Sequence, residues 1–148
     1  MKVFISWSGD RAGQLAEAVR AWLPKVLQSL APWASSADIV KGARWLGEIQ
    51  EHLRDSKFGL ICVTPENQME PWLLFEAGAL SNALGTELVA PLLLGLEPSS
   101  LRPPLSQFQA TSAEKEDFRK LVQTLNSRLV ERPLPERQLD ESFEVWWP

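Results

Sequence analysis

The chain has 148 residues, of which 45% are hydrophobic and 23% charged, and its formal net charge is −4. This length suits one folded domain with a single core, and the acidic balance argues against a nucleic-acid partner or an anionic membrane surface. The chain has one cysteine and one histidine, which argues against a disulfide, a metal centre or a Ser-His-Asp triad and fits a reducing cytoplasm. No apolar run reaches the roughly 18 residues of a membrane span.

The first part of the chain alternates strand and helix patterns. After a short β-rich run, apolar residues recur every three or four positions, as on an amphipathic helix, and Pro24 inside that pattern should bend it. The expected elements are a strand at 2–7, a helix from 10 to about 30, a weak strand at 30–33, a loop at 35–44 and a helix from 45 to about 56.

The second part continues the alternation. The run FGLICVT at 58–64 is apolar and rich in β-branched residues, which is typical of a central parallel strand covered on both faces. The further expected elements are a helix from Pro71 to near Gly85, a strand at 87–94, an irregular Pro-rich stretch, a short strand at 107–110 and a helix at 115–129 with Ser112 as its N-cap. This order predicts an α/β fold of the flavodoxin-like class, a doubly wound parallel sheet of five strands with helices on both faces.

We expect one domain over residues 1–132 and a C-terminal extension over 133–148. The extension turns polar after Pro133 and Pro135 and ends on Val-Trp-Trp-Pro, which reads as a helix just beginning or as a linker. We therefore expect the natural chain to continue beyond Pro148 into a sensor domain.

One carboxylate stands out, because Glu76 is the only ionisable residue in the apolar segment 71–80 (PWLLFEAGAL). A carboxylate on an apolar helix face is unfavourable unless it is paired, protonated or used in chemistry. The structural alternative is an ion pair with Arg11 or Arg44, and the functional alternative is a carboxylate that acts on a substrate at the edge of the sheet.

A single carboxylate limits the reactions that the site can catalyse. O-glycosidases normally need two carboxyl groups, one of which protonates the leaving group. Nicotinamide on ribose leaves as a neutral molecule without protonation, so one glutamate that stabilises the ribosyl oxocarbenium would suffice. No metal ion and no cofactor are expected, and NAD⁺ would be the substrate.

Ligands of doubly wound sheets bind at the carboxyl ends of the strands. The segments expected there are 7–11, 33–44, 64–70 and the stretch after Leu94. Several side chains within and beside these segments have two possible roles. Trp72 either packs in the core or lines a nucleotide pocket, and the hydroxyls of Ser6 and Ser8 either cap a helix or bind ligand. Lys41 is either solvated or contacts a pyrophosphate. His52 and Cys62 are expected to be inert.

Three motifs in order resemble Toll/interleukin-1 receptor (TIR) domains, and the resemblance covers residues 1–130. Residues 3–8 (VFISWS) resemble their first strand and loop, and 35–45, ending in GARW, resembles the BB loop that leads into the second helix. Residues 71–80 are similar to the third-helix motif of the bacterial branch.

The resemblance implies cleavage of NAD⁺ into nicotinamide and ADP-ribose or a cyclic isomer, with Glu76 as the catalytic glutamate. It also implies self-association of TIR domains, a partner sensor and a role in bacterial anti-phage defence. Trp7 departs from many relatives, which have His or Tyr at that position. The candidate substrate-binding residues are Phe4, Ser6, Trp7, Ser8, Arg11, Lys41, Trp45 and Trp72.

Two other functions stay open at this point. A non-catalytic TIR scaffold would only assemble with other TIR domains, and it would not need Glu76. An enzyme similar to nucleoside deoxyribosyltransferases would also direct a glutamate against an N-glycosidic bond, but it should carry further acidic and aromatic pocket residues.

Overall fold

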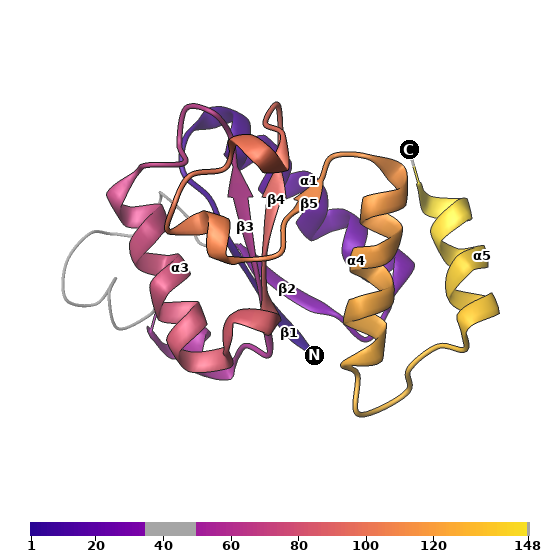
Figure 1. Cartoon of the computed structure of the whole chain (residues 1–148). Helices are drawn as coiled ribbons and strands as arrows, with labels where there is room; N and C mark the ends of the chain where they lie inside the picture. The colour runs from indigo at the N-terminus through magenta and orange to yellow at the C-terminus, as the bar shows by residue number, and fades with distance from the viewer. Residues whose placement is uncertain (35–49, 148) are drawn as a thin grey trace.

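Five parallel strands form the sheet in the part of the chain that the computed structural model describes, residues 1–34 and 50–147 (Figure 1). The strands are β1 (Lys2–Ser6), β2 (Ala31–Ala34), β3 (Phe58–Val63), β4 (Val89–Leu93) and β5 (Thr111–Ser112). Their order is β2-β1-β3-β4-β5, with every neighbouring pair parallel. This is the flavodoxin-like order, so the predicted fold class is confirmed.

Helices cover both faces of the sheet. The helices α1 (Asp10–Val26), α4 (Lys115–Ser127) and α5 (Glu136–Trp146) share one apolar cluster with one face, and α3 (Pro71–Leu84) packs in a second cluster on the other. Figure 1 shows α3 on one side of the sheet and α4 with α5 on the opposite side. All six residues of β3 are buried, as expected for a central strand. None of the helices in the described ranges is long and apolar enough to cross a bilayer.

Helix α1 ends earlier than the apolar pattern predicts. The pattern continues to Leu30, but the helix stops at Val26 and Leu27 has an extended backbone, with φ of −130° and ψ of 99°. Pro24 lies two residues before the end of the helix, within its last turn. Pro24 therefore marks the last turn of the helix rather than a bend within it. Beyond β2, residues 50–55 are helical, in agreement with the described part of the helix expected at 45–56.

The strands at the far side of the sheet are shorter than predicted. Thr86–Leu88 forms a 3₁₀ turn, so β4 begins at Val89. The strand predicted at 107–110 is wrong, because Leu105–Gln107 is also a 3₁₀ turn and Phe108 is buried in the cluster under α3. Pairing with β4 starts only at Thr111, opposite Leu92.

Ser112 does not cap α4, since the N-cap residue is Glu114. The backbone N–H and the hydroxyl of Ser112 instead donate to Asp117 Oδ2 at 3.0 and 2.7 Å. These bonds lower the pKa of the Asp117 carboxyl and connect the end of the sheet to the first turn of α4.

The segment after Pro135 forms a complete helix instead of the beginning of one. The aromatic rings of Phe143 and Trp147 pack against Trp22 of α1, with centroids 5.9 and 6.0 Å away. Trp22 Nε1 also donates to the Trp146 carbonyl at 2.9 Å, and Ser142 Oγ donates to the Val26 carbonyl at 2.8 Å. These contacts join the helix to α1.

Candidate active site

Helix α3 carries Glu76 into the interior of the protein. Pro71 occupies the first turn, where its missing N–H has no helical partner to lose. Gly85 ends the helix with φ of 91° and ψ of 152°. The positive φ suits glycine, but this ψ lies outside the left-handed helical region that the sequence predicts for the cap. Leu73, Ala77 and Leu80 are buried on the face toward the sheet, and Glu76 is buried with them.

The Glu76 carboxylate meets the end of the first strand. Its exposed fraction is 0%, and Ser6 Oγ donates a hydrogen bond to Glu76 Oε1 at 3.1 Å. Ser6 is the last residue of β1 and is itself fully buried. An uncompensated carboxylate would be strongly destabilising at this depth, so the hydroxyl both orients the group and offsets part of its desolvation.

Aromatic side chains pack beside this pair on the same face of the sheet. Phe4, two residues before Ser6 on β1, is fully buried, and its ring centroid lies 5.3 Å from that of Trp33. The Trp33 ring stacks on His52 with centroids 3.7 Å apart, and His52 is half-buried. Phe4 and Ser6 therefore lie on the Glu76 side of the sheet, and their role as pocket residues stays a prediction.

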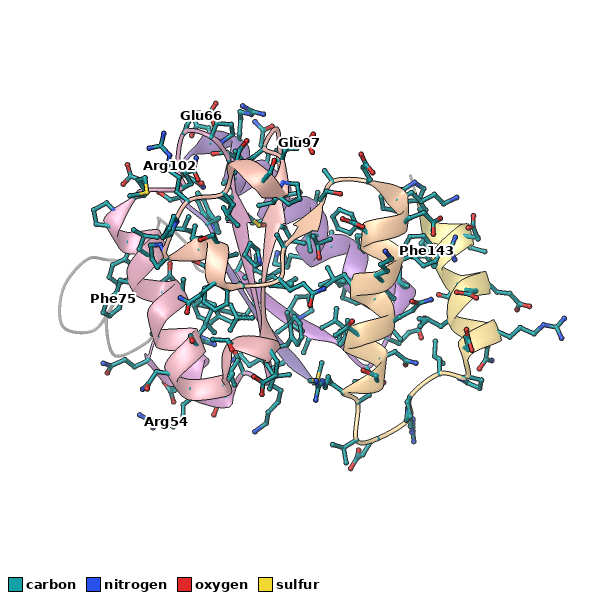
Figure 2. All side chains as sticks on the ribbon, viewed as in Figure 1. Arg54, Glu66, Phe75, Glu97, Arg102 and Phe143 are labelled. Carbon is teal, nitrogen blue, oxygen red and sulfur yellow. The ribbon has the colours of Figure 1, made fainter. Side chains whose placement is uncertain are left out.

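Trp72, one turn before Glu76, is half-buried against the same apolar cluster. Its ring stacks on Phe75 with centroids 4.9 Å apart. Phe75 is 49% exposed, and Figure 2 shows it on the outer side of α3. Trp72 thus connects the buried cluster around Glu76 with the protein surface.

Trp7, a predicted substrate-binding residue, packs on the face of the sheet opposite Glu76. Its ring packs against Gly13 of α1, where a side-chain carbon on the glycine would come within 2.9 Å of the indole. Trp7 also belongs to the apolar cluster under α1, α4 and α5. Successive side chains of a strand point to opposite faces, so Trp7 follows Ser6 onto the other side.

Ser8 and Arg11 line a hollow of about 290 Å³ between the loops that follow β1 and β3. Arg11 Nη1 forms an ion pair with Glu66 Oε1 at 2.8 Å, so the alternative that Arg11 neutralises Glu76 is not what the structure shows. Both side chains are more than half exposed, at 52% and 63%, and such a pair adds little stability. Hydrogen bonds from its own backbone N–H and from Thr64 lower the pKa of Glu66, with a smaller contribution from Arg11. Figure 2 shows Glu66 at the end of the molecule to which β3 points.

The loop between β3 and α3 contains two buried polar residues that the sequence analysis missed, Asn67 and Gln68. Asn67 is 2% exposed, and its amide bonds to three backbone groups. Gln68 is 9% exposed, and its Oε1 accepts from the backbone N–H of Arg102 at 3.1 Å. The two proline residues that bracket this loop predicted a turn, but nothing in the sequence distinguishes its buried amides from solvated ones.

Lys41 and Trp45, together with Gly42 and Arg44, lie outside the described residues. Cys62 is buried in β3, and burial raises the pKa of its thiol to about 12, so it fits the core role predicted for it. A larger hollow, of about 800 Å³, is lined by Lys57, Arg128 and Arg132 among others and contains none of the predicted site residues.

Comparison with known proteins establishes the family. The family model described as TIR domain matches residues 3–126, and the chain therefore belongs to the TIR domain family. Among curated proteins, no sequence matches. A solved prokaryotic SEFIR domain is similar, with 18% identity, a TM-score of 0.58 and coverage of 91% of this chain and 96% of that one. The TIR domains of the activated Roq1 resistosome that recognises the effector XopQ are similar at 16% identity and a TM-score of 0.50, over 96% of this chain and 80% of that one. At these identities, both likenesses show the fold alone.

Proposed function

We propose that this TIR domain is an NAD⁺ glycohydrolase in which Glu76 is the catalytic residue. The observation that carries the proposal is a fully buried carboxylate on α3, oriented by Ser6 from the end of β1. An interaction module has no evident need for a carboxylate in that position, because burying it is unfavourable.

In the proposed reaction the bond between ribose C1′ and the nicotinamide nitrogen breaks, and its electron pair leaves with neutral nicotinamide. The positive charge that develops on the ribosyl ring is stabilised by the Glu76 carboxylate, which Ser6 holds in place. Water then attacks C1′ and releases a proton to solvent to give ADP-ribose, or a nucleophile in the same molecule bonds to C1′, with loss of its proton where it carries one, to close a cyclic isomer. The aromatic surface of Trp72 is the proposed wall for the nicotinamide-ribose end.

Substrate must reach a carboxylate that has no exposed surface in the single chain. We therefore propose that the site opens when copies of the domain assemble, and that the protein acts as a cytoplasmic effector of bacterial anti-phage defence downstream of a sensor. Phe75 and Met69, 49% and 51% exposed at α3 and the loop before it, provide apolar surface for such an assembly.

These same exposed residues also favour the second candidate, a TIR module that only assembles. The two functions differ in their need for Glu76, so the test compares nicotinamide release from NAD⁺ by the wild type and by Glu76→Ala, at high protein concentration. We expect release by the wild type and none above background by Glu76→Ala.

The matched control is Glu97→Ala, which removes an exposed carboxylate near Glu66 at the same end of the molecule (Figure 2). It should release nicotinamide at the wild-type rate. Equal turnover by the wild type and Glu76→Ala would remove Glu76 from the mechanism. If the assembled wild type releases no nicotinamide, the result favours the TIR module that only assembles.

A further inference from the structure

Asn67 uses its whole side-chain amide inside the protein. Oδ1 accepts from the Thr64 backbone N–H at 2.8 Å, and Nδ2 donates to the carbonyls of Ser8 at 2.8 Å and Cys62 at 3.0 Å. With only 2% of its surface exposed, the side chain cannot exchange these partners for water.

These bonds join the two elements that meet at the candidate catalytic carboxylate. The Ser8 carbonyl lies two residues beyond Ser6, just past the end of β1. On the other side, the Asn67 carbonyl accepts from the Glu70 N–H at 2.9 Å, and the Glu70 carbonyl accepts from the Leu74 N–H at 3.1 Å in the first turn of α3. A short hydrogen-bonded path therefore runs from the end of β1 through Asn67 to the helix that carries Glu76.

We propose that Asn67 is a positioning residue that sets the distance between the end of β1 and the start of α3, and with it the contact between Ser6 and Glu76. Its effect on turnover rests on the proposed function, whereas its effect on the two elements does not. Only an amide satisfies both requirements, since the side chain must accept from one N–H and donate to two carbonyls. Gln68, through its bond to Arg102, attaches the same loop to the stretch after β4.

The test is the isosteric change Asn67→Asp, which keeps the acceptor for Thr64 but replaces the donor with an oxygen facing two carbonyls. Asn126→Asp is the matched control. Asn126 bonds the Leu134 backbone in the same manner, donating from Nδ2 and accepting at Oδ1, each at 2.8 Å, in the connection between α4 and α5. The two changes disturb equivalent amide contacts, but only Asn67 adjoins the candidate site.

We expect Asn67→Asp to speed amide hydrogen exchange in the segments 6–13 and 67–77. It should also lower kcat for nicotinamide release about tenfold and leave KM within about threefold of the wild-type value. A tenfold loss is the size of effect that one lost buried hydrogen bond produces. Asn126→Asp should speed exchange only around 122–136 and leave both kinetic constants unchanged. If the aspartate variant does not fold, Asn67→Ser removes the donors without adding charge.

The proposal is overturned if Asn67→Asp speeds amide hydrogen exchange in 6–13 and 67–77 no more than Asn126→Asp does. A kcat equal to that of Asn126→Asp would overturn it as well. Faster exchange at both segments in a protein whose wild type releases no nicotinamide would support the structural coupling and would reject the proposed function instead.

Discussion

A carboxylate without exposed surface is unfavourable to keep, and at Glu76 one hydroxyl offsets part of that cost. Ser6 and Glu76 are 70 residues apart in the chain, and they meet because β1 lies next to β3 and α3 packs over both. Hydrogen bonds to a charged group stabilise by about 1.5–3 kcal/mol, more than those between neutral groups. The hydrogen bond between Ser6 and Glu76 is therefore the first interaction of this site to test.

A double-mutant cycle of Ser6→Ala and Glu76→Gln measures that interaction. Ser6→Ala alone should lower the free energy of unfolding by about 1–2 kcal/mol, because it removes a donor from a buried charge. The same change should cost less in the Glu76→Gln background, where the amide oxygen still accepts from Ser6 but carries no charge. Urea denaturation of the four proteins gives the coupling energy, and strictly additive effects would mean that the contact does not stabilise the fold.

Site residues could be predicted from the sequence where the helix or strand period places their side chains on one face. Glu76 is visible as the one charge in an apolar helix, and Phe4 and Ser6 share a face because strand side chains alternate. The same alternation puts Trp7 on the other face, and its role in substrate binding stays a prediction. Asn67 was not predictable, since its three partners become neighbours only in the folded chain.

The position of α3 depends on a close approach to the sheet. Gly59 in β3 lies under Leu80, and a side-chain carbon on Gly59 would come within 2.8 Å of Leu80 Cδ1. The missing side chain lets the helix approach the central strand. Gly78, on the exposed side of the same helix, has no atom within 4 Å of such a carbon.

These two glycines predict opposite effects of the same substitution. Gly59→Ala should lower the free energy of unfolding by about 1–3 kcal/mol, because Leu80 must move in a packed core. Gly78→Ala should raise it by about 0.5–1 kcal/mol through better helix propensity. Chemical denaturation of both variants checks the pair. A neutral Gly59→Ala would show that α3 does not depend on this contact.

At the level of elements, the long apolar patterns predicted best. The central strand β3 and helix α3 lie within a residue or two of their expected ranges. Burial on both faces gives β3 an unbroken apolar run, and Pro71 and Gly85 mark the two ends of α3. The last strand was misplaced, since a two-residue edge strand has no pattern of its own. Helix α5 was expected only as the start of a helix or as a linker, because its buried residues Leu139 and Phe143 are too few to define a period.

On the scale of the whole molecule, α5 completes the core on the α1 side. Phe143 is 1% exposed and lies between α4 and α5 in Figure 2, close to Trp22 and Trp147. The family match ends at residue 126, before this helix begins. The predicted boundary at residue 132 stays a prediction, but the packing of Phe143 makes α5 part of the same folded unit as α1.

Phe143→Ala should therefore destabilise the entire domain, by about 3–5 kcal/mol for a buried phenylalanine. The buried Cys62 thiol, with its pKa raised to about 12, reports this directly, because it reacts only after β3 is exposed. Thiol labelling in urea should shift to lower denaturant for Phe143→Ala and stay unchanged for Val145→Ala, whose side chain is 72% exposed. If Phe143→Ala leaves the urea dependence of Cys62 labelling unchanged, α5 folds independently of the sheet.

The most direct test of the central claim is the rate of nicotinamide release from NAD⁺ when the domain is concentrated on a surface that forces assembly. The comparison is between the wild type and Glu76→Gln, which preserves the shape of the side chain and removes only its charge. We predict release by the wild type, at least a hundredfold less by the variant (roughly 2.7 kcal/mol of transition-state stabilisation), and resistance of the variant to urea at least equal to that of the wild type, because the substitution removes a buried charge. A fully active Glu76→Gln protein would contradict the assignment of Glu76 as the catalytic carboxylate.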